Sequence, residues 1–316
     1  MEDIRKRTDS YVLYFMSTLI ERFLIRKSEK SSFRPLFILG PARSGTTLIY
    51  QALVGGIECC YFSNIMSRYP RIPGTLTKVL GRFGHFDYIP DYRNFYGKTK
   101  GWNGPAQGSE IWSRWFPKSH EVESDVICDL EEWKLANLIH FMQRASGRPF
   151  VNKWPGLSVY VPILRKLFPN ALFVRVKREP IDTALSVING RRQLLGDESV
   201  SISRVPRGYE SFSKDTPYRQ VAAYVMGIEK QLDRELKGCD DAVFAVKYEE
   251  FCASPERLRA SVIEWYSDLQ TDNIIVKRTA APIIIHPGSA RILKDAEGEE
   301  IRKAFEYVEK FGMFIR

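Results

Sequence analysis

Long hydrophobic runs are missing from this sequence of 316 residues. The uncharged run Tyr11–Ile20 has about half the length that a helix needs to cross a bilayer. No small-residue cleavage site follows it, so we expect no signal peptide. We expect residues 1–30 to form a helix that packs on the domain. The alternative is a helix in peripheral contact with a membrane surface, which the flanking Arg5–Arg7 would favour.

Paired cysteines and clustered histidines are missing as well. The five cysteines include no C-x-x-C pair, which argues against a disulfide framework and against a zinc site. The four histidines are too scattered to suggest a bound metal. We therefore predict a cytoplasmic protein without a metal, with reduced thiols at Cys59, Cys60, Cys128, Cys239 and Cys252.

Motifs for nucleic-acid binding are a third absence. Neither the spacing of a C₂H₂ zinc finger nor an RNP stretch is visible, and we expect no nucleic-acid partner. The chain is nevertheless basic, with 47 Lys and Arg against 38 Asp and Glu and a net charge of +9. Such a surplus suits anionic ligands or a membrane surface, but a diffuse surplus is also typical of an ordinary solvated surface.

The most informative segment that is present is 36–56. Four apolar residues, Leu36–Leu39, predict a short buried strand, and Gly40–Gly45 predict a tight turn. Apolar residues at helical spacing follow until Gly55 and Gly56. Strand, glycine turn and helix together form a phosphate cradle, because the free amides and the dipole of the helix N-terminus attract an anion. Within it, Gly45 permits close approach of the backbone, and Thr46 and Thr47 add hydroxyl donors.

This segment differs from a nucleotide-kinase loop at one decisive position. The Walker pattern G-x-x-x-x-G-K-[ST] matches the spacing of Gly40 and Gly45, but Thr46 replaces the lysine. The cation lies inside the turn instead, as Arg43. We therefore expect a phosphate site without the lysine that serves a triphosphate. The plain alternative is a Gly/Pro turn between a core strand and a core helix.

Strands and helices alternate along the rest of the chain. This order predicts an α/β protein: a three-layer, P-loop NTPase-like fold with a central parallel sheet flanked by helices. We expect an N-terminal helix and linker over 1–32 and a main domain over 33–316, with an insert at about 57–149 whose long loops are typical of functional segments. Further strands are expected at 150–152, 171–176, 242–246 and 283–285, and helices at 130–144, 159–168, 180–195, 222–236, 255–269 and 297–311.

A second signal lies where the third strand meets its helix. Arg178 leaves the strand end, and Ser186 lies about two turns into the next helix. Ligands of parallel sheets bind at the carboxyl ends of the strands, so an arginine and a hydroxyl there can hold a second phosphate. Taken alone, an arginine after a strand is more often a surface cation.

Together these motifs resemble the sulfotransferases that use 3′-phosphoadenosine-5′-phosphosulfate (PAPS), in the form found in tyrosylprotein and carbohydrate sulfotransferases. Pro41–Thr47 resemble the Pro-Arg-Ser-Gly-Thr-Thr loop, with one residue inserted after the proline. Arg178–Ser186 resemble the family's R-x-P-x-D-x-x-x-S motif. Asn152–Pro155 resemble the run between the two motifs, and Val246–Phe251 resemble the family's Tyr-Glu-Asp-Leu-like strand end.

The resemblance implies an enzyme that moves a sulfuryl group from PAPS to an acceptor hydroxyl, such as that of a carbohydrate or a lipid-like alcohol, and releases 3′,5′-adenosine bisphosphate. It implies that Arg178 and Ser186 bind the 3′-phosphate. Arg43 and Lys153 would stabilise the charge of the transferring group, and no metal would be needed. The residues implied to hold the 5′-phosphosulfate are Arg43, Ser44, Gly45, Thr46 and Thr47.

The general base is not indicated by the resemblance. Tyrosylprotein sulfotransferases carry a glutamate soon after the loop helix, and the matching place here holds Asn64, which is not a base. We take Glu110 first, because it precedes an aromatic run that could shape a pocket, and His120 second; His85 and Asp87 are further candidates. The alternative is that Glu110 is a surface acid and that the run, with Trp112 and Trp115, belongs to the core.

Two other assignments and two rival functions remain open. Trp154 is a candidate for stacking on adenine, and Arg291, with Lys294 nearby, is a candidate for a loop that closes over the nucleotide. One rival is a P-loop kinase-like phosphotransferase, against which the missing lysine argues. The other is a non-catalytic nucleotide- or glycan-binding protein on the same fold, which Asn64 would favour.

Overall fold

The computed structural model describes residues 16–26, 29–93, 99–116, 132–277, 282–285 and 295–311. Its centre is a sheet of four parallel strands in the order β2-β1-β3-β4. The strands are β1 (Leu36–Leu39), β2 (Val151–Lys153), β3 (Leu172–Lys177) and β4 (Val243–Lys247). The predicted α/β class and parallel sheet are therefore confirmed.

The strand β1 is the most deeply buried element of the sheet. All four of its side chains are fully buried, which is expected for a central strand covered on both faces. Phe37 contacts four aromatic rings, those of Trp112, Phe150, Phe168 and Phe173. This core fixes the carboxyl end of β1, from which the glycine turn departs.

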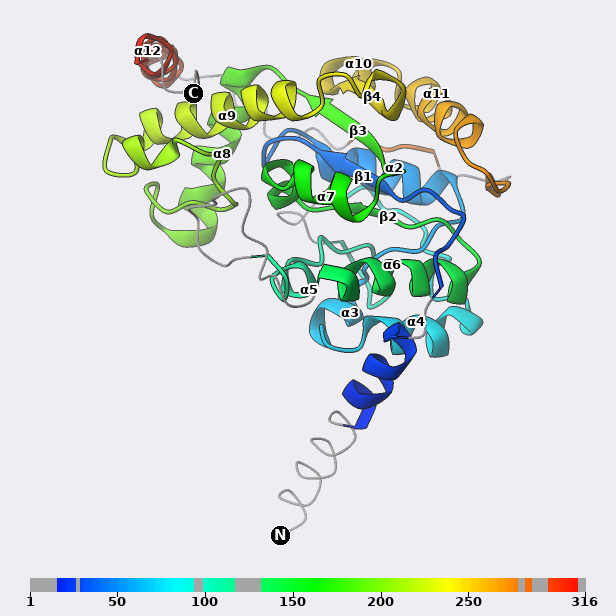
Figure 1. Ribbon diagram of the computed structural model, residues 1–316. Helices are drawn as coiled ribbons and strands as arrows, with labels where there is room; N and C mark the ends of the chain where they lie inside the picture. Colours follow the sequence, from blue (N-terminus) through cyan, green and yellow to red (C-terminus); the bar gives the residue numbers. More distant parts are fainter. Residues whose placement is uncertain are drawn as a thin grey trace.

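Helices cover both faces of the sheet (Figure 1). One face carries α2 (Thr46–Gly56) and α11 (Pro255–Asp268), which also contact each other. The other carries α7 (Val161–Leu167) and α9 (Pro217–Glu235), and α8 (Pro180–Leu195) packs on α9. The sheet and its two helical layers form the predicted three-layer arrangement. The other elements around the sheet are α10 (Tyr248–Ala253), α12 (Asp295–Lys310), η2 (Pro155–Val159), η3 (Tyr209–Phe212) and η4 (Asp240–Ala242).

The segment between α2 and β2 forms a separate group of short elements beside β2. It begins with an extended stretch in which Cys60 bridges Phe150 in parallel, so this stretch runs alongside β2 toward the same edge of the sheet. Helix α4 packs on α6, and α3 packs on α5. The elements are α3 (Asn64–Arg68), α4 (Pro73–Leu80), η1 (Gly81–Phe83), α5 (Ser109–Trp112) and α6 (Glu132–Ser146).

Some predicted boundaries shift. Helix α9 begins at Pro217, five residues before the predicted start at 222, because Thr216 caps it by accepting a hydrogen bond from the amide of Arg219. Ile283–Ile285 form no strand. Residues 16–26 are helical, and the rest of the predicted N-terminal helix lies outside the described residues. Among the described helices, none has the length and apolar character needed to cross a membrane.

Candidate functional site

The loop between β1 and α2 has an unusual backbone. Gly40 has φ 151°, Gly45 has φ 93° and Arg43 has φ 71°. A side chain at Gly40 would meet the carbonyl oxygen of Val176 at 2.8 Å, and α2 has no side-chain cap at its start. The amides of Leu48 and Ile49 donate to the carbonyl of Gly45, whereas those of Thr46 and Thr47 precede the first helical bond and have no partner within the helix.

Two residues far along the chain hold this loop in place. The amide of Gly40 donates to Ser158 Oγ at 2.9 Å, and the amide of Ala42 donates to the Tyr224 hydroxyl at 2.7 Å. Sequence patterns did not indicate either residue, because their role depends on the packing of η2 and α9 against the loop. The Ser44 hydroxyl donates to the carbonyl of Pro41 at 2.8 Å. Ser44 therefore shapes the loop through its side chain.

A lysine from β2 reaches the start of α2. The pairing of Ile38 with Lys153 places the end of β2 next to the end of β1. Lys153 Nζ donates to Thr47 Oγ1 at 2.9 Å, and the lysine side chain is buried, with 3% exposed. Burial, with the nearby charge of Arg43, lowers the pKa of Lys153 from 10.5 to about 7. Such a buried cation at the helix start is a place where an anion would be strongly stabilised.

The two predicted phosphate motifs meet at Arg43. Its Nε donates to Ser186 Oγ on α8 at 3.2 Å, and its backbone carbonyl accepts a hydrogen bond of 2.9 Å from Arg178 Nη1. The backbone of α8 stays close to Arg43 at Gly190, where an added Cβ would lie 3.9 Å from Arg43 Cδ. The structure thus brings Arg43, Arg178 and Ser186 together, although 135 residues separate the two arginines.

Tyr248, the first residue of α10, was not among the predicted site residues. Its ring packs so closely on Gly45 that a Cβ at that position would lie 2.1 Å from Tyr248 Cδ2. The Arg178 guanidinium lies over the same ring, 4.7 Å from its centroid. Val246–Phe251 had been matched to a strand end of the family, and that match was the available signal for this residue.

These residues suit a ligand with two separated phosphates. Arg43, Lys153 and Arg178 are cationic, and Thr47 and Ser186 contribute hydroxyl groups. The buried Nε of Arg178 has no hydrogen-bond partner, although such donors in proteins usually have one. The donor set and the glycine cradle under Tyr248 therefore fit the 5′- and 3′-phosphates of PAPS.

In the segment 57–149, Asn64 and His85 have structural partners. Asn64 Nδ2 donates to the carbonyls of Thr99 and Gly101, at 2.8 and 2.6 Å, and so holds the loop that follows them. His85 Nε2 lies 2.9 Å from Ser63 Oγ, and burial lowers the pKa of His85 to about 4. Only 1% of His85 is exposed, so it is screened from a substrate in this conformation.

The remaining base candidates are placed differently. Glu110 is exposed in the first turn of α5. Asp87 pairs with Arg148 at 2.9 Å, and His120 lies outside the described residues. Of the described candidates, His85 and Asp87 are therefore engaged by structural partners, whereas Glu110 is exposed.

The aromatic run after Glu110 belongs to the core, as the alternative interpretation proposed. Trp112 is fully buried and Trp115 is 4% exposed. Trp112 Nε1 donates to Asn152 Oδ1 at 2.9 Å, which links α5 to the residue before Lys153. Trp154 is 7% exposed and stacks with Phe116 and Tyr160. Arg291 and Lys294 lie outside the described residues.

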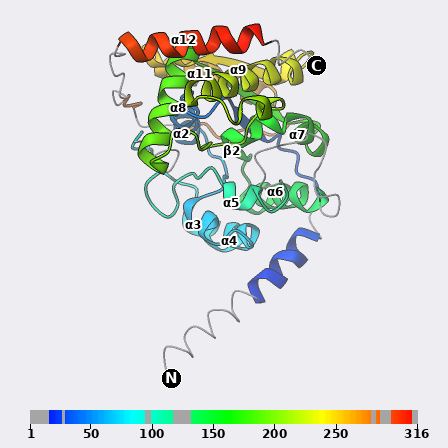
Figure 2. The same cartoon turned by 90° about the vertical axis from the view of Figure 1, so that its left-hand side faces the viewer.

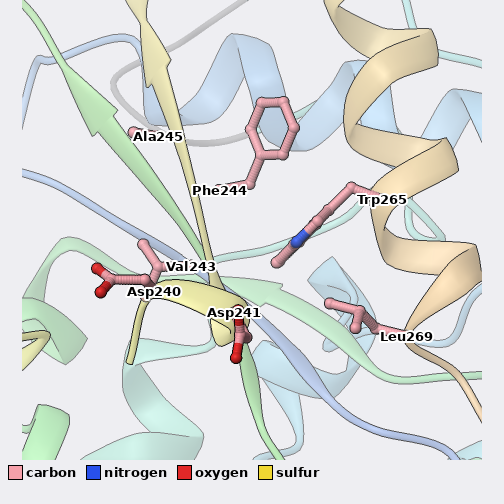
Figure 3. Close-up of a pocket in the computed structure, with 7 residues that line it drawn as sticks. All are labelled: Asp240, Asp241, Val243, Phe244, Ala245, Trp265 and Leu269. Carbon is pink, nitrogen blue, oxygen red and sulfur yellow. The ribbon is translucent and has the colours of Figure 1, made fainter. Parts of the chain in front are cut away.

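A hollow of about 650 Å³ lies at the other edge of the sheet (Figure 3). It is lined by Phe244, Trp265 and Leu269, with Asp240 and Asp241 just before the start of β4. The phosphate loop lies at the carboxyl end of the strands, whereas this hollow lies at the amino end of β4. Its two carboxylates would also repel an anionic ligand, so it is not the donor site.

Comparison with known proteins agrees with the site. The sulfotransferase family model matches residues 35–269, which include both phosphate motifs. No curated protein matches the sequence.

The chain is similar to solved structures of sulfotransferases, and the first of these shows the same fold. Sulfotransferase STF9 from Mycobacterium avium is 16% identical, with a TM-score of 0.50, and the match covers 88% of this chain and 69% of STF9. STF1 from Mycobacterium tuberculosis H37Rv is 15% identical, with a TM-score of 0.44, covering 79% of this chain and 74% of STF1. The sulfotransferase domain of the curacin biosynthetic pathway is 15% identical, also with a TM-score of 0.44, and the match covers 75% of this chain and 74% of that domain.

Proposed function

Because this chain belongs to the sulfotransferase family and is a sulfuryl-transferring enzyme, we propose that its donor is PAPS and its acceptor a hydroxyl group of a small molecule or glycan. The loop Gly40–Thr47 would hold the 5′-phosphosulfate, with Arg43 and Lys153 beside it. Arg178 and Ser186 would hold the 3′-phosphate. The observation that carries the proposal is that two cations from neighbouring strand ends, Lys153 and Arg178, reach the loop that contains Arg43.

Lys153, the amides at the start of α2 and Arg178 would have different tasks in sulfuryl transfer. Bound PAPS would supply the sulfuryl group and a phosphate leaving group. Negative charge grows on that leaving phosphate during transfer, and the buried Lys153 and the amides at the start of α2 would stabilise it. A nearby anion also favours the protonated form of Lys153, whose pKa is about 7 without one. Arg178 orients the nucleotide through the 3′-phosphate, away from the reacting atoms.

We propose that the segment at about 57–149 binds the acceptor and that Glu110 or His120 removes its proton. The exposed position of Glu110 on α5 leaves its carboxylate accessible. Substitution of the true base should lower kcat by about 10² to 10⁴-fold and leave donor affinity unchanged. The test measures kcat for Glu110→Gln and His120→Asn separately, with Glu264→Gln, at an exposed position on α11, as a control. Unchanged turnover in both variants would exclude both residues as the base.

The donor assignment is tested by ligand-dependent stability. At about 100 times its Kd, a ligand adds roughly 2.7 kcal/mol to the free energy of unfolding. We expect 3′,5′-adenosine bisphosphate to raise the thermal midpoint more than ATP does. Arg178→Ala should remove this preference, because it removes the contact with the 3′-phosphate.

Arg257→Ala, at an exposed position on α11, is the matched control and should behave like wild type. A rise with ATP that equals or exceeds the rise with the bisphosphate, and that Arg178→Ala leaves unaltered, would contradict the proposal. The kinase-like alternative would then take its place.

We also propose the cytoplasm as the compartment of the reaction. Cys59, Cys60, Cys239 and Cys252 are free thiols, which supports a reducing environment. Cys59 and Cys60 are buried neighbours, and burial raises the pKa of Cys59 to about 12, so this thiol stays protonated and unreactive.

A further inference from the structure

The helix over residues 16–26 turns its apolar face to solvent. Met16, Leu19, Ile20 and Phe23 lie at the i, i+3, i+4, i+7 spacing of one helix face, and their exposed fractions are 50, 43, 49 and 60%. A surface helix normally buries such a face. In Figures 1 and 2 this helix projects from the body beyond α4, at the end of the molecule opposite α12.

The orientation of this helix is fixed by a buried acid on its other face. Glu21 is 1% exposed, and its carboxylate accepts hydrogen bonds from the amides of Gly74 and Thr75, at 2.8 and 2.6 Å. These are first-turn amides of α4, so Glu21 caps that helix and interacts favourably with its dipole. Rotating the helix to bury Phe23 would remove the carboxylate from both amides.

The neighbouring surface adds apolar and basic side chains. Val79 on α4 is 51% exposed, and Phe83 on η1 is 79% exposed. Each directly follows an exposed cation, Lys78 or Arg82, and these two cations are four residues apart, at helical spacing. A cavity of about 420 Å³ lies between this surface, the N-terminal helix and α6. It is lined by Phe23, Leu24, Phe141 and Ala145 together with Lys78, Arg82, Arg144 and Glu29.

Positive charge dominates this end of the molecule. The 28 residues between Glu58 and Asp87 include no Asp or Glu, but include Arg68, Arg71, Lys78 and Arg82. The pKa of Lys134 on α6 is lowered, first by burial and then by the nearby positive charges of Arg22 and Arg114. The acid at the cavity, Glu29, is paired with Arg144.

We propose that this face, made of Met16, Leu19, Ile20 and Phe23 with Lys78, Val79, Arg82 and Phe83, docks on a membrane surface that contains anionic phospholipids. The apolar side chains enter the boundary between headgroups and acyl chains, and the cations bind lipid phosphates. The combination is what distinguishes the face: apolar residues drive insertion, and basic residues at its edge select a negative surface.

The same charge argues against a second copy of the chain as the occupant. A two-fold interface places the same surface of both copies against each other. Lys78 and Arg82 would then face identical cations, with Glu29 already paired to Arg144. A membrane of anionic lipid offers the opposite charge over the whole face.

The test is co-sedimentation of the full chain with vesicles of phosphatidylcholine alone and of phosphatidylcholine with phosphatidylglycerol. We expect binding to the anionic vesicles that weakens with added salt, because the charge interaction is screened. Leu19→Ser/Phe23→Ser and, separately, Lys78→Glu/Arg82→Glu should each lower the partition coefficient at least about tenfold. Leu194→Ser/Leu195→Ser, which changes two exposed apolar residues of α8, is the matched control and should bind like wild type.

Retained secondary structure and thermal midpoint in the variants show that they fold. Equal sedimentation of wild type with both vesicle types would overturn the proposal. Binding to anionic vesicles that is undiminished in both double variants would also overturn it. A concentration-dependent dimer in analytical ultracentrifugation that Leu19→Ser/Phe23→Ser abolishes would overturn it as well, because a second copy would then cover the face.

Discussion

At the scale of single residues, Lys153 makes stability depend on pH. Its pKa is about 7 in the folded protein and 10.5 when unperturbed. Below pH 7 both the folded and the unfolded chain carry the proton, and the cost of burying the charge is fully present. Between about pH 7 and 10.5 the folded chain has lost this proton and the unfolded chain keeps it. The contribution of Lys153 to the free energy of unfolding therefore rises with pH through this window.

We predict that wild type gains up to about 1 kcal/mol per pH unit, relative to Lys153→Met, between pH 7.5 and 9. Urea denaturation of both proteins across this range measures the difference, and groups common to both cancel. A parallel pH dependence of the two proteins would show that Lys153 is protonated throughout. The same titration should weaken binding of 3′,5′-adenosine bisphosphate above pH 7 in wild type, because the cation near the 5′-phosphate is lost.

At the scale of elements, the start of α2 depends on how α10 packs on it. A Cβ at Gly45 would lie 2.1 Å from the Tyr248 ring, at a φ of 93° that disfavours side chains. We predict that Gly45→Ala lowers the free energy of unfolding by about 2 to 4 kcal/mol and removes donor binding, since the ring and the loop must separate.

Gly147→Ala separates the effect of backbone strain from the effect of the contact with Tyr248. Gly147 has φ 65°, and nothing lies within 4 Å of an added Cβ, so this variant tests backbone strain alone. We expect a loss of about 1 kcal/mol there, with donor binding intact. Urea denaturation and calorimetric titration with 3′,5′-adenosine bisphosphate measure both quantities. Equal losses of stability in the two variants would mean that the contact with Tyr248 contributes nothing beyond strain.

At the scale of the whole molecule, the order of the strands assembles the proposed donor site. The order β2-β1-β3-β4 places the ends of β2, β3 and β4 around the loop that leaves β1. Lys153, Arg178 and Tyr248 reach the loop from these three ends. The segment 57–149, which we propose binds the acceptor, lies beyond β2, on the side of Lys153.

Local patterns in the sequence were enough to predict most elements of this arrangement. The apolar run Leu36–Leu39, the glycine turn and the helix that follows were predicted and confirmed, and α8 has the predicted bounds Pro180–Leu195. The segment 57–149 was harder to interpret. Its Gly, Pro and aromatic residues have no clean period, and the burial of Trp112 depends on packing against β1 and β2.

The sequence by itself determined the α/β class, the glycine turn between β1 and α2, and the helix that follows Arg178, because turn chemistry and periodicity act between residues that are close in the chain. Only the tertiary structure decided that Arg43 meets Ser186 and that Tyr248 covers Gly45, because these contacts depend on strand order. The tertiary structure also decided that Lys153 is buried. In the helix over residues 16–26, it decided that Glu21 points inward while the apolar face points outward. Burial and the direction of a helix face follow from what packs against a residue, and those partners are distant in the chain.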